Sequence, residues 1–101
     1  MPCVQIDRDA SSDMLEIADS IIVSQNDSRA AELFIDEIEQ KFRSYSHQPG
    51  MGTLREDLGE GLRCFTVRKQ YVVIYRPIDD GISVLRIFHG ARDYPRLFHE
   101  R

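Results

Sequence analysis

The spacing of the apolar residues changes once along this chain, and this change limits the folds that the chain can adopt. From residue 14 to residue 49 they recur every three or four positions, as in amphipathic helices, whereas after residue 61 they recur every second position, as in half-buried strands. With 101 residues, 42% of them hydrophobic, the chain can bury one core without a disulfide or a metal ion. We therefore expect a single α+β domain over residues 1–101.

The first half predicts an antiparallel helix hairpin that follows a short edge strand at Val4–Ile6. Ser11 or Ser12 offers the N-cap of the first helix. Its inner face is expected to contain Met14, Ile17, Ala18 and Ile21, and its outer face Asp13, Glu16 and Asp19. The second helix ends at Pro49-Gly50, and its apolar stripe consists of Ala31, Phe34, Ile35, Ile38, Phe42 and Tyr45.

The second half predicts a meander of three strands after a surface loop at residues 50–61. The strands are expected at residues 62–67, 71–76 and 82–88, joined by turns at 68–70 and 77–81, of which the second is longer than the two-residue kind. Residues 71–75 are apolar on both faces, as in a central strand. With a short C-terminal helix, the predicted fold is a helix hairpin packed on a mainly antiparallel sheet in the order β-α-α-β-β-β.

Ionisable side chains gather where the last strand ends. His89, Arg92 and Asp93 surround Gly90, which ends the apolar run. They either cap the following short helix through hydrogen bonds and ion pairs or form part of a functional surface. Arg63, at the start of the meander, has the same two interpretations, and Arg86, between Leu85 and Ile87, is expected to face solvent or a binding partner.

Several kinds of site find no support in the sequence. Cys3 and Cys64 are far apart, and no cysteine or histidine has the spacing of a metal site. No phosphate-binding loop occurs, and the adjacent Asp79 and Asp80 point in different directions within a turn. No apolar run is long enough to cross a membrane, and the N-terminus lacks the regions of a signal peptide. We therefore expect a cytoplasmic protein without a cofactor, a metal ion or catalytic residues.

The charge is divided between the two halves of the chain. The first 60 residues have 5 basic and 13 acidic side chains, a net charge of −8, and the remaining residues have a net charge of +4. This division favours an oppositely patterned protein partner over a nucleic-acid backbone, or else reflects two solvated faces. We also expect no direct, sequence-specific binding to a nucleic acid.

Five short motifs occur in an order that is typical of one family of toxins. They are Ala10-x-x-Asp13, Pro49-x-x-Gly52, Leu62-Arg63, Tyr71-x-x-Ile74-Tyr75 and His89-Gly90-Ala91-Arg92-Asp93. With the predicted order of strands and helices, they make the chain resemble the ParE branch of the RelE/ParE superfamily over nearly its whole length. The resemblance implies the toxin component of a type II toxin–antitoxin module.

The two branches of this superfamily act differently, and the sequence favours the ParE branch. RNA-cleaving toxins resembling RelE use basic residues on two strands and a tyrosine near the C-terminus, and the matching positions here are Cys64, Thr66, Val72 and Phe98. Only Arg92 keeps a cation. The resemblance therefore implies a non-enzymatic inhibitor of DNA gyrase. A ribosome-dependent mRNA endonuclease and a non-toxic, protein-binding relic of the fold remain as alternatives.

The resemblance also implies a ParD-like antitoxin that folds over the helix hairpin and sheet and forms a hetero-oligomer with the toxin. Phe34, Phe42 and Tyr45 are candidate anchors for the antitoxin if they are exposed. The candidate contacts with the target or a partner are Arg63, Arg86, His89, Arg92 and Asp93.

Overall fold

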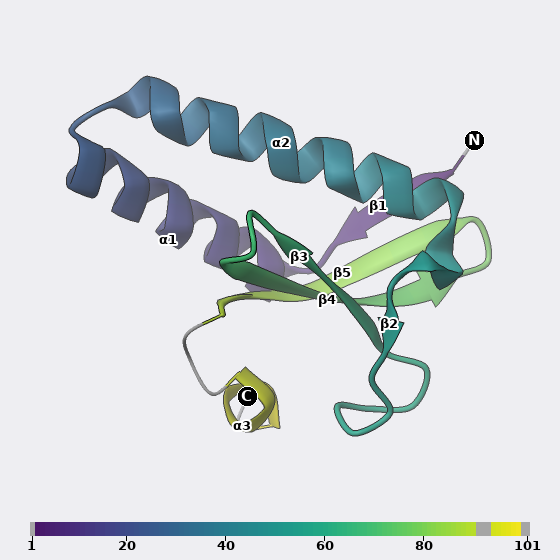
Figure 1. Ribbon diagram of the computed structural model, residues 1–101. Helices are drawn as coiled ribbons and strands as arrows, with labels where there is room; N and C mark the ends of the chain where they lie inside the picture. Colours follow the sequence, from purple (N-terminus) through teal and green to yellow (C-terminus); the bar gives the residue numbers. More distant parts are fainter. Residues whose placement is uncertain (1, 91–93, 100–101) are drawn as a thin grey trace.

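The computed structural model describes residues 2–90 and 94–99, and within them a sheet of five strands carries a helix hairpin on one face (Figure 1). The elements are β1 (Cys3–Ile6), α1 (Arg8–Gln25), α2 (Ser28–His47), the short 3-10 helix η1 (Pro49–Met51), β2 (Thr53–Leu54), β3 (Arg63–Val67), β4 (Tyr71–Ile78), β5 (Gly81–His89) and α3 (Tyr94–His99). The strand order is β1-β5-β4-β3-β2, with β1 parallel to β5 and the other pairs antiparallel. The predicted fold class is confirmed.

The first helix begins earlier than predicted. Asp7, extended at the end of β1, is the N-cap, and its carboxylate accepts a hydrogen bond of 3.0 Å from the backbone N–H of Arg8. Ser11 and Ser12 therefore lie inside α1, where the Ser11 N–H already donates to the Asp7 carbonyl. The prediction was wrong because an aspartate caps a helix as well as a serine does, and Asp7 comes first along the chain.

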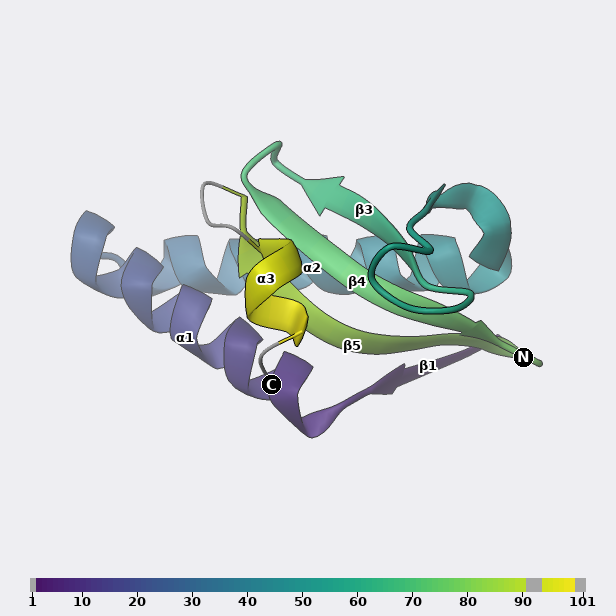
Figure 2. The same ribbon diagram turned by 90° about the horizontal axis from the view of Figure 1, so that it is seen from below.

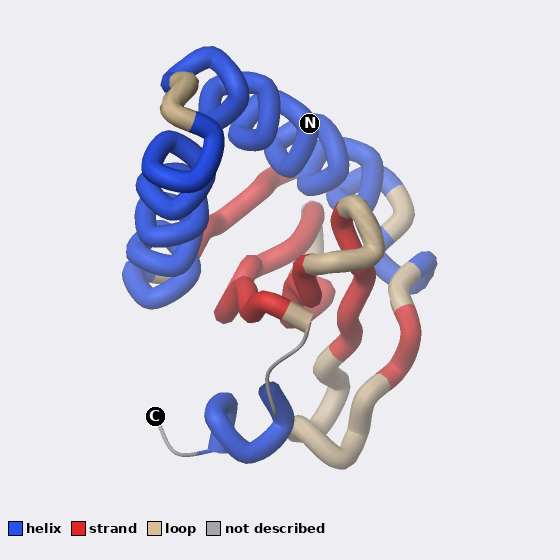
Figure 3. The backbone as a smooth tube through the Cα atoms, turned by 60° about the vertical axis from the view of Figure 1, so that its left-hand side comes forward, coloured by secondary structure: helices blue, strands red, loops and turns tan. Residues whose placement is uncertain are grey.

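The helix hairpin covers the upper face of the sheet and forms the main core with it (Figure 3). Phe34, Ile38 and Phe42 of α2 are at most 1% exposed, as the apolar stripe predicted. Tyr45 stacks on Phe65 of β3, with ring centroids 4.0 Å apart. The central strand β4 is buried on both faces, because a second layer lies beneath the sheet.

This second layer consists of α3 and the loop between β2 and β3 (Figure 2). Here a lower core, separate from the main one, contains Leu58, Leu62, Cys64, Val72, Ile74, Phe88 and Phe98. Phe98 comes from α3 and is 8% exposed, so the short helix covers the sheet with an apolar side chain.

Two predicted loops are partly regular structure. β2, within the predicted loop at residues 50–61, pairs with β3 over two residues, which is too short for an alternating pattern to reveal. β4 continues to Ile78, and Ile78 pairs with Gly81, so Asp79-Asp80 is a two-residue connection and the longer turn was wrong. Pairing between β3 and β4 stops at Tyr75, so beyond this residue β3 makes no backbone hydrogen bonds to that edge of β4. Pro77, which lacks an N–H, can therefore lie within β4.

Three of the family motifs form one hydrogen-bonded unit around the Tyr75 hydroxyl. This hydroxyl donates to the Pro49 carbonyl at 2.6 Å and accepts from the Gly52 N–H at 3.0 Å. Arg63 Nη1 donates to the carbonyl oxygens of Gly50 and Gly52, at 3.2 and 2.8 Å. Burial raises the pKa of Tyr75, and the Gly52 N–H opposes this effect. The motifs therefore fix the chain between α2 and β2.

Gly52→Ala should destabilise the protein by roughly 1–3 kcal/mol, because a Cβ there would lie 2.4 Å from the Tyr75 hydroxyl oxygen and 2.9 Å from the Cys64 carbonyl oxygen. Urea unfolding measures the change. Gly50→Ala is the matched control, since nothing lies within 4 Å of a Cβ at that position. Equal effects of the two substitutions would contradict this explanation of the motif.

Candidate functional site

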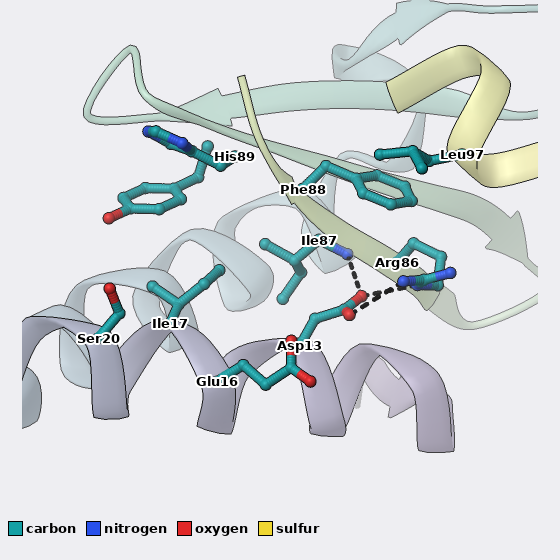
Figure 4. A pocket seen from close by; sticks show the side chains of 10 residues that line it. Asp13, Glu16, Ile17, Ser20, Arg86, Ile87, Phe88, His89 and Leu97 are labelled. Atoms are coloured by element: carbon teal, nitrogen blue, oxygen red, sulfur yellow. Dashed lines mark hydrogen bonds and ion pairs between the residues drawn. The ribbon is translucent and has the colours of Figure 1, made fainter. Parts of the chain in front are cut away.

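A cleft of about 400 Å³ opens between α1, the end of β5 and α3 (Figure 4). It combines ionisable side chains with an apolar wall, and it contains two residues, Arg86 and His89, that the sequence analysis singled out. The residues that line it are Asp13, Glu16, Ile17, Ser20, Tyr71, Arg86, Ile87, Phe88, His89 and Leu97.

The carboxylate of Asp13 organises the floor of this cleft. It accepts hydrogen bonds from Arg86 Nε at 2.7 Å and Arg86 Nη2 at 3.1 Å, and a third from the backbone N–H of Ile87 at 2.9 Å (Figure 4). The two side chains are only 11% and 19% exposed. The bonds to Asp13 raise the pKa of Arg86, and burial opposes this effect.

These contacts correct two predictions. Asp13 was placed on the outer face of α1 but is buried, and Arg86 was expected to face solvent or a partner but is paired within the chain. The reason is that β1 pairs with β5 only from Gly81 to Val84. Beyond Val84 this edge of β5 lies beside α1, and Asp13 supplies the acceptor that a neighbouring strand would otherwise provide.

The other candidates at the C-terminal end are only partly placed by the structure. His89 is exposed at the last position of β5, and its ring centroid lies 5.5 Å from that of Tyr71. Arg92 and Asp93 lie outside the described residues, and their grouping with His89 stays a prediction. Arg63 serves the Gly50 and Gly52 carbonyls, as its structural interpretation anticipated.

Two of the three proposed antitoxin anchors were wrong. Phe34 and Phe42 are 0% and 1% exposed, because they fill the space between α2 and the sheet, and Tyr45 is only partly exposed. A shallow groove of about 320 Å³ between α1 and α2 was not predicted from the sequence. It is lined by Ala18, Ile22, Ser28, Ala31, Glu32, Ile35 and Asp36. Leu15, Ala18 and Ile22 lie three and four positions apart on α1, and this second stripe was the available signal.

The positions that the sequence match assigned to the catalytic residues of RNA-cleaving toxins lie on or beside the lower core. Cys64, Val72 and Phe98 are each no more than 8% exposed and belong to the same apolar cluster. Thr66, on β3, is exposed. The mapped positions are thus close together in space, but three of them carry packed apolar side chains.

Within residues 2–90 and 94–99, no three His, Cys, Asp or Glu side chains are grouped so that they could hold a metal ion. Nor does any helix in this part of the chain have the length and apolar character that crossing a membrane requires.

Comparisons with known proteins decide the family. The family model described as "ParE toxin of type II toxin-antitoxin system, parDE" matches residues 4–94. This chain belongs to the ParE toxin family. Toxin ParE3 of Caulobacter vibrioides is 35% identical to it over 69 residues, which is 68% of either chain. The resemblance found in the sequence motifs is therefore confirmed.

A solved structure supports the fold of this ParE family member. A chain of the "chromosomal ParDE TA system from P. aeruginosa" superimposes with a TM-score of 0.73 and covers 88% of this chain and 96% of its own length. The sequences are 21% identical, so this comparison shows the common fold.

Asp13→Asn should lower the free energy of unfolding by about 2–3 kcal/mol, because it leaves Arg86 partly buried without its counter-charge. Thermal or urea denaturation measures the loss. Asp19→Asn is the control on the same helix, since Asp19 is exposed, and it should change stability by less than about 0.5 kcal/mol. If both variants are as stable as the wild type, Asp13 does not hold α1 against β5.

Proposed function

We propose that this toxin inhibits DNA gyrase by binding and trapping its complex with cleaved DNA, without a catalytic step of its own. The apolar packing of the lower core supports a mechanism without catalysis. A nuclease that activates a ribose hydroxyl needs a general base or several cations at one place. Where the RNA-cleaving relatives carry them, this chain has the thiol of Cys64, the isopropyl group of Val72 and the ring of Phe98, packed together.

The arginine that lines the neighbouring cleft does not replace the missing cations. Arg86 is held by two hydrogen bonds to Asp13, and its guanidinium carbon lies 4.5 Å from the centre of the Phe88 ring. Its charge therefore serves the fold first. A function through surface contact fits this arrangement better than phosphoryl transfer.

The purified chain should convert supercoiled DNA to the linear form only when gyrase is present. Gel electrophoresis after protein denaturation measures the linear product, and a gyrase-free reaction is the control. Ribosome-dependent cleavage of a transcript, abolished by Arg92→Ala, would instead support the endonuclease. Normal growth of a bacterium in which the chain is induced alone would support the non-toxic relic.

We also propose that a ParD-like antitoxin neutralises the toxin by docking on the groove between α1 and α2. The groove is lined by the apolar side chains of Ile22, which is 38% exposed, and Ile35, and also by the acidic residues Glu32 and Asp36. An amphipathic segment with aliphatic anchors and basic flanking residues fits this combination. A segment that is disordered alone can fold on such a surface.

Ile22→Lys should weaken antitoxin binding by roughly tenfold or more, since it places a charge against the apolar part of the interface. Val23→Lys is the matched control, because Val23 is 83% exposed and does not line the groove. Titration calorimetry with the purified antitoxin compares the two variants. Equal affinities would place the antitoxin elsewhere on the toxin.

A further inference from the structure

The turn between β3 and β4 holds two long basic residues in a conformation that suits neither. Arg68 and Lys69 have φ values of 56° and 59°, and the Gln70 N–H donates to the Val67 carbonyl at 3.1 Å. Positive φ at both central positions is the type I′ arrangement, for which Asn-Gly is the favoured pair. The backbone conformation of the turn therefore does not explain why an arginine and a lysine occur here. The explanation has to come from contacts that their side chains make.

Arg68 fixes the turn to the helix hairpin. Its Nε donates to Glu37 Oε1 of α2 at 3.0 Å, and its guanidinium carbon lies 5.4 Å from the centre of the Phe34 ring. Both contacts hold the turn against α2. Arg68 thus makes its contacts within the protein, and these contacts fix the backbone position of the neighbouring Lys69.

Lys69 presents its charge from this fixed turn. It is exposed, and among the described residues its ammonium group has no ion-pair partner. The exposed Thr66 and Gln70 beside it in the sequence add a hydroxyl and an amide. The Gly90 N–H donates to the Gln70 carbonyl, which ties the turn to the end of β5 next to His89.

The chemistry of this corner matches the phosphate backbone of a nucleic acid. Lysine, threonine and glutamine side chains are all common donors to phosphate oxygens, and such contacts do not depend on sequence. Glu37, the acidic residue that contacts the turn, is already paired with Arg68. The net charge of −4 opposes DNA binding by the whole molecule, so the contact needs a partner that already holds DNA.

We propose that Lys69 contacts a backbone phosphate of the DNA held by the target enzyme. This inference rests on the proposed action on gyrase. It adds a direct contact between the toxin and DNA, located on the turn between β3 and β4.

The chain contains two lysines, Lys41 and Lys69, which provides a matched pair of variants. Lys69→Ala should bind the gyrase–DNA complex roughly threefold to tenfold more weakly than the wild type. The slope of log affinity against log salt should become shallower by about one, the contribution of one phosphate contact. Lys41→Ala, which removes an exposed lysine of α2, should match the wild type. All three proteins should bind gyrase without DNA equally.

Lys69→Gly separates this role from folding, because glycine is at ease at φ 59°. Its melting temperature should equal or exceed that of the wild type while the DNA-dependent affinity falls as in Lys69→Ala. Unchanged affinity and salt slope in Lys69→Ala would overturn the proposal. An equal loss without DNA would also overturn it, by assigning Lys69 to a protein surface. If the wild type neither binds gyrase nor yields linear DNA, the proposed function itself fails, and this contact with it.

Discussion

The carboxylate of Asp13 joins the helix hairpin to the sheet where backbone pairing ends. β1 is too short to cover the whole edge of β5, and beyond Val84 the N–H of Ile87 would otherwise lie unpaired in a buried position. One carboxylate satisfies this N–H and also pairs with Arg86. The arrangement allows a four-residue strand and an 18-residue helix to share one edge of the sheet.

Both faces of the sheet are covered, and the segments that cover them come from different parts of the sequence. The upper face is covered by the hairpin, which precedes most of the sheet in sequence, and the lower face by α3 and the loop before β3. β4 belongs to both cores, which explains its continuous apolar sequence. The family motifs reinforce this arrangement, since Asp13, Gly52, Arg63 and Tyr75 all make internal contacts. In this chain, four of the five motifs therefore serve the fold.

The proposed mode of action depends on the lower face of the sheet. The positions that the sequence match assigns to the catalytic groups of RNA-cleaving toxins are Cys64, Thr66, Val72 and Phe98, and three of them belong to the lower apolar core of this chain. Packing of this kind makes the face part of the fold, and under the proposed function the helix groove and the exposed turns contact the partners. A protein that acts by binding can tolerate this exchange, since it needs complementary surfaces rather than a reactive centre.

From the sequence alone we could predict the helix hairpin, the three-stranded meander with its central strand, and the family. These depend on local spacing: α2 and β4 are long enough to show their periods, whereas β2, with two residues, is not. The face of Asp13 could not be predicted, because an acidic residue beside an apolar stripe looks solvent-exposed until a partner is known.

The side chains that meet across different elements could not be predicted from the sequence. Asp13 and Arg86 are 73 positions apart, and Arg68 and Glu37 are 31 apart, so neither pair leaves a periodic signal. The same applies to the burial of Phe34 and to the gathering of Cys64, Val72 and Phe98 under one helix. Periodicity assigns a residue to a face of its own element, but contact across elements depends on strand register and on where the neighbouring element ends.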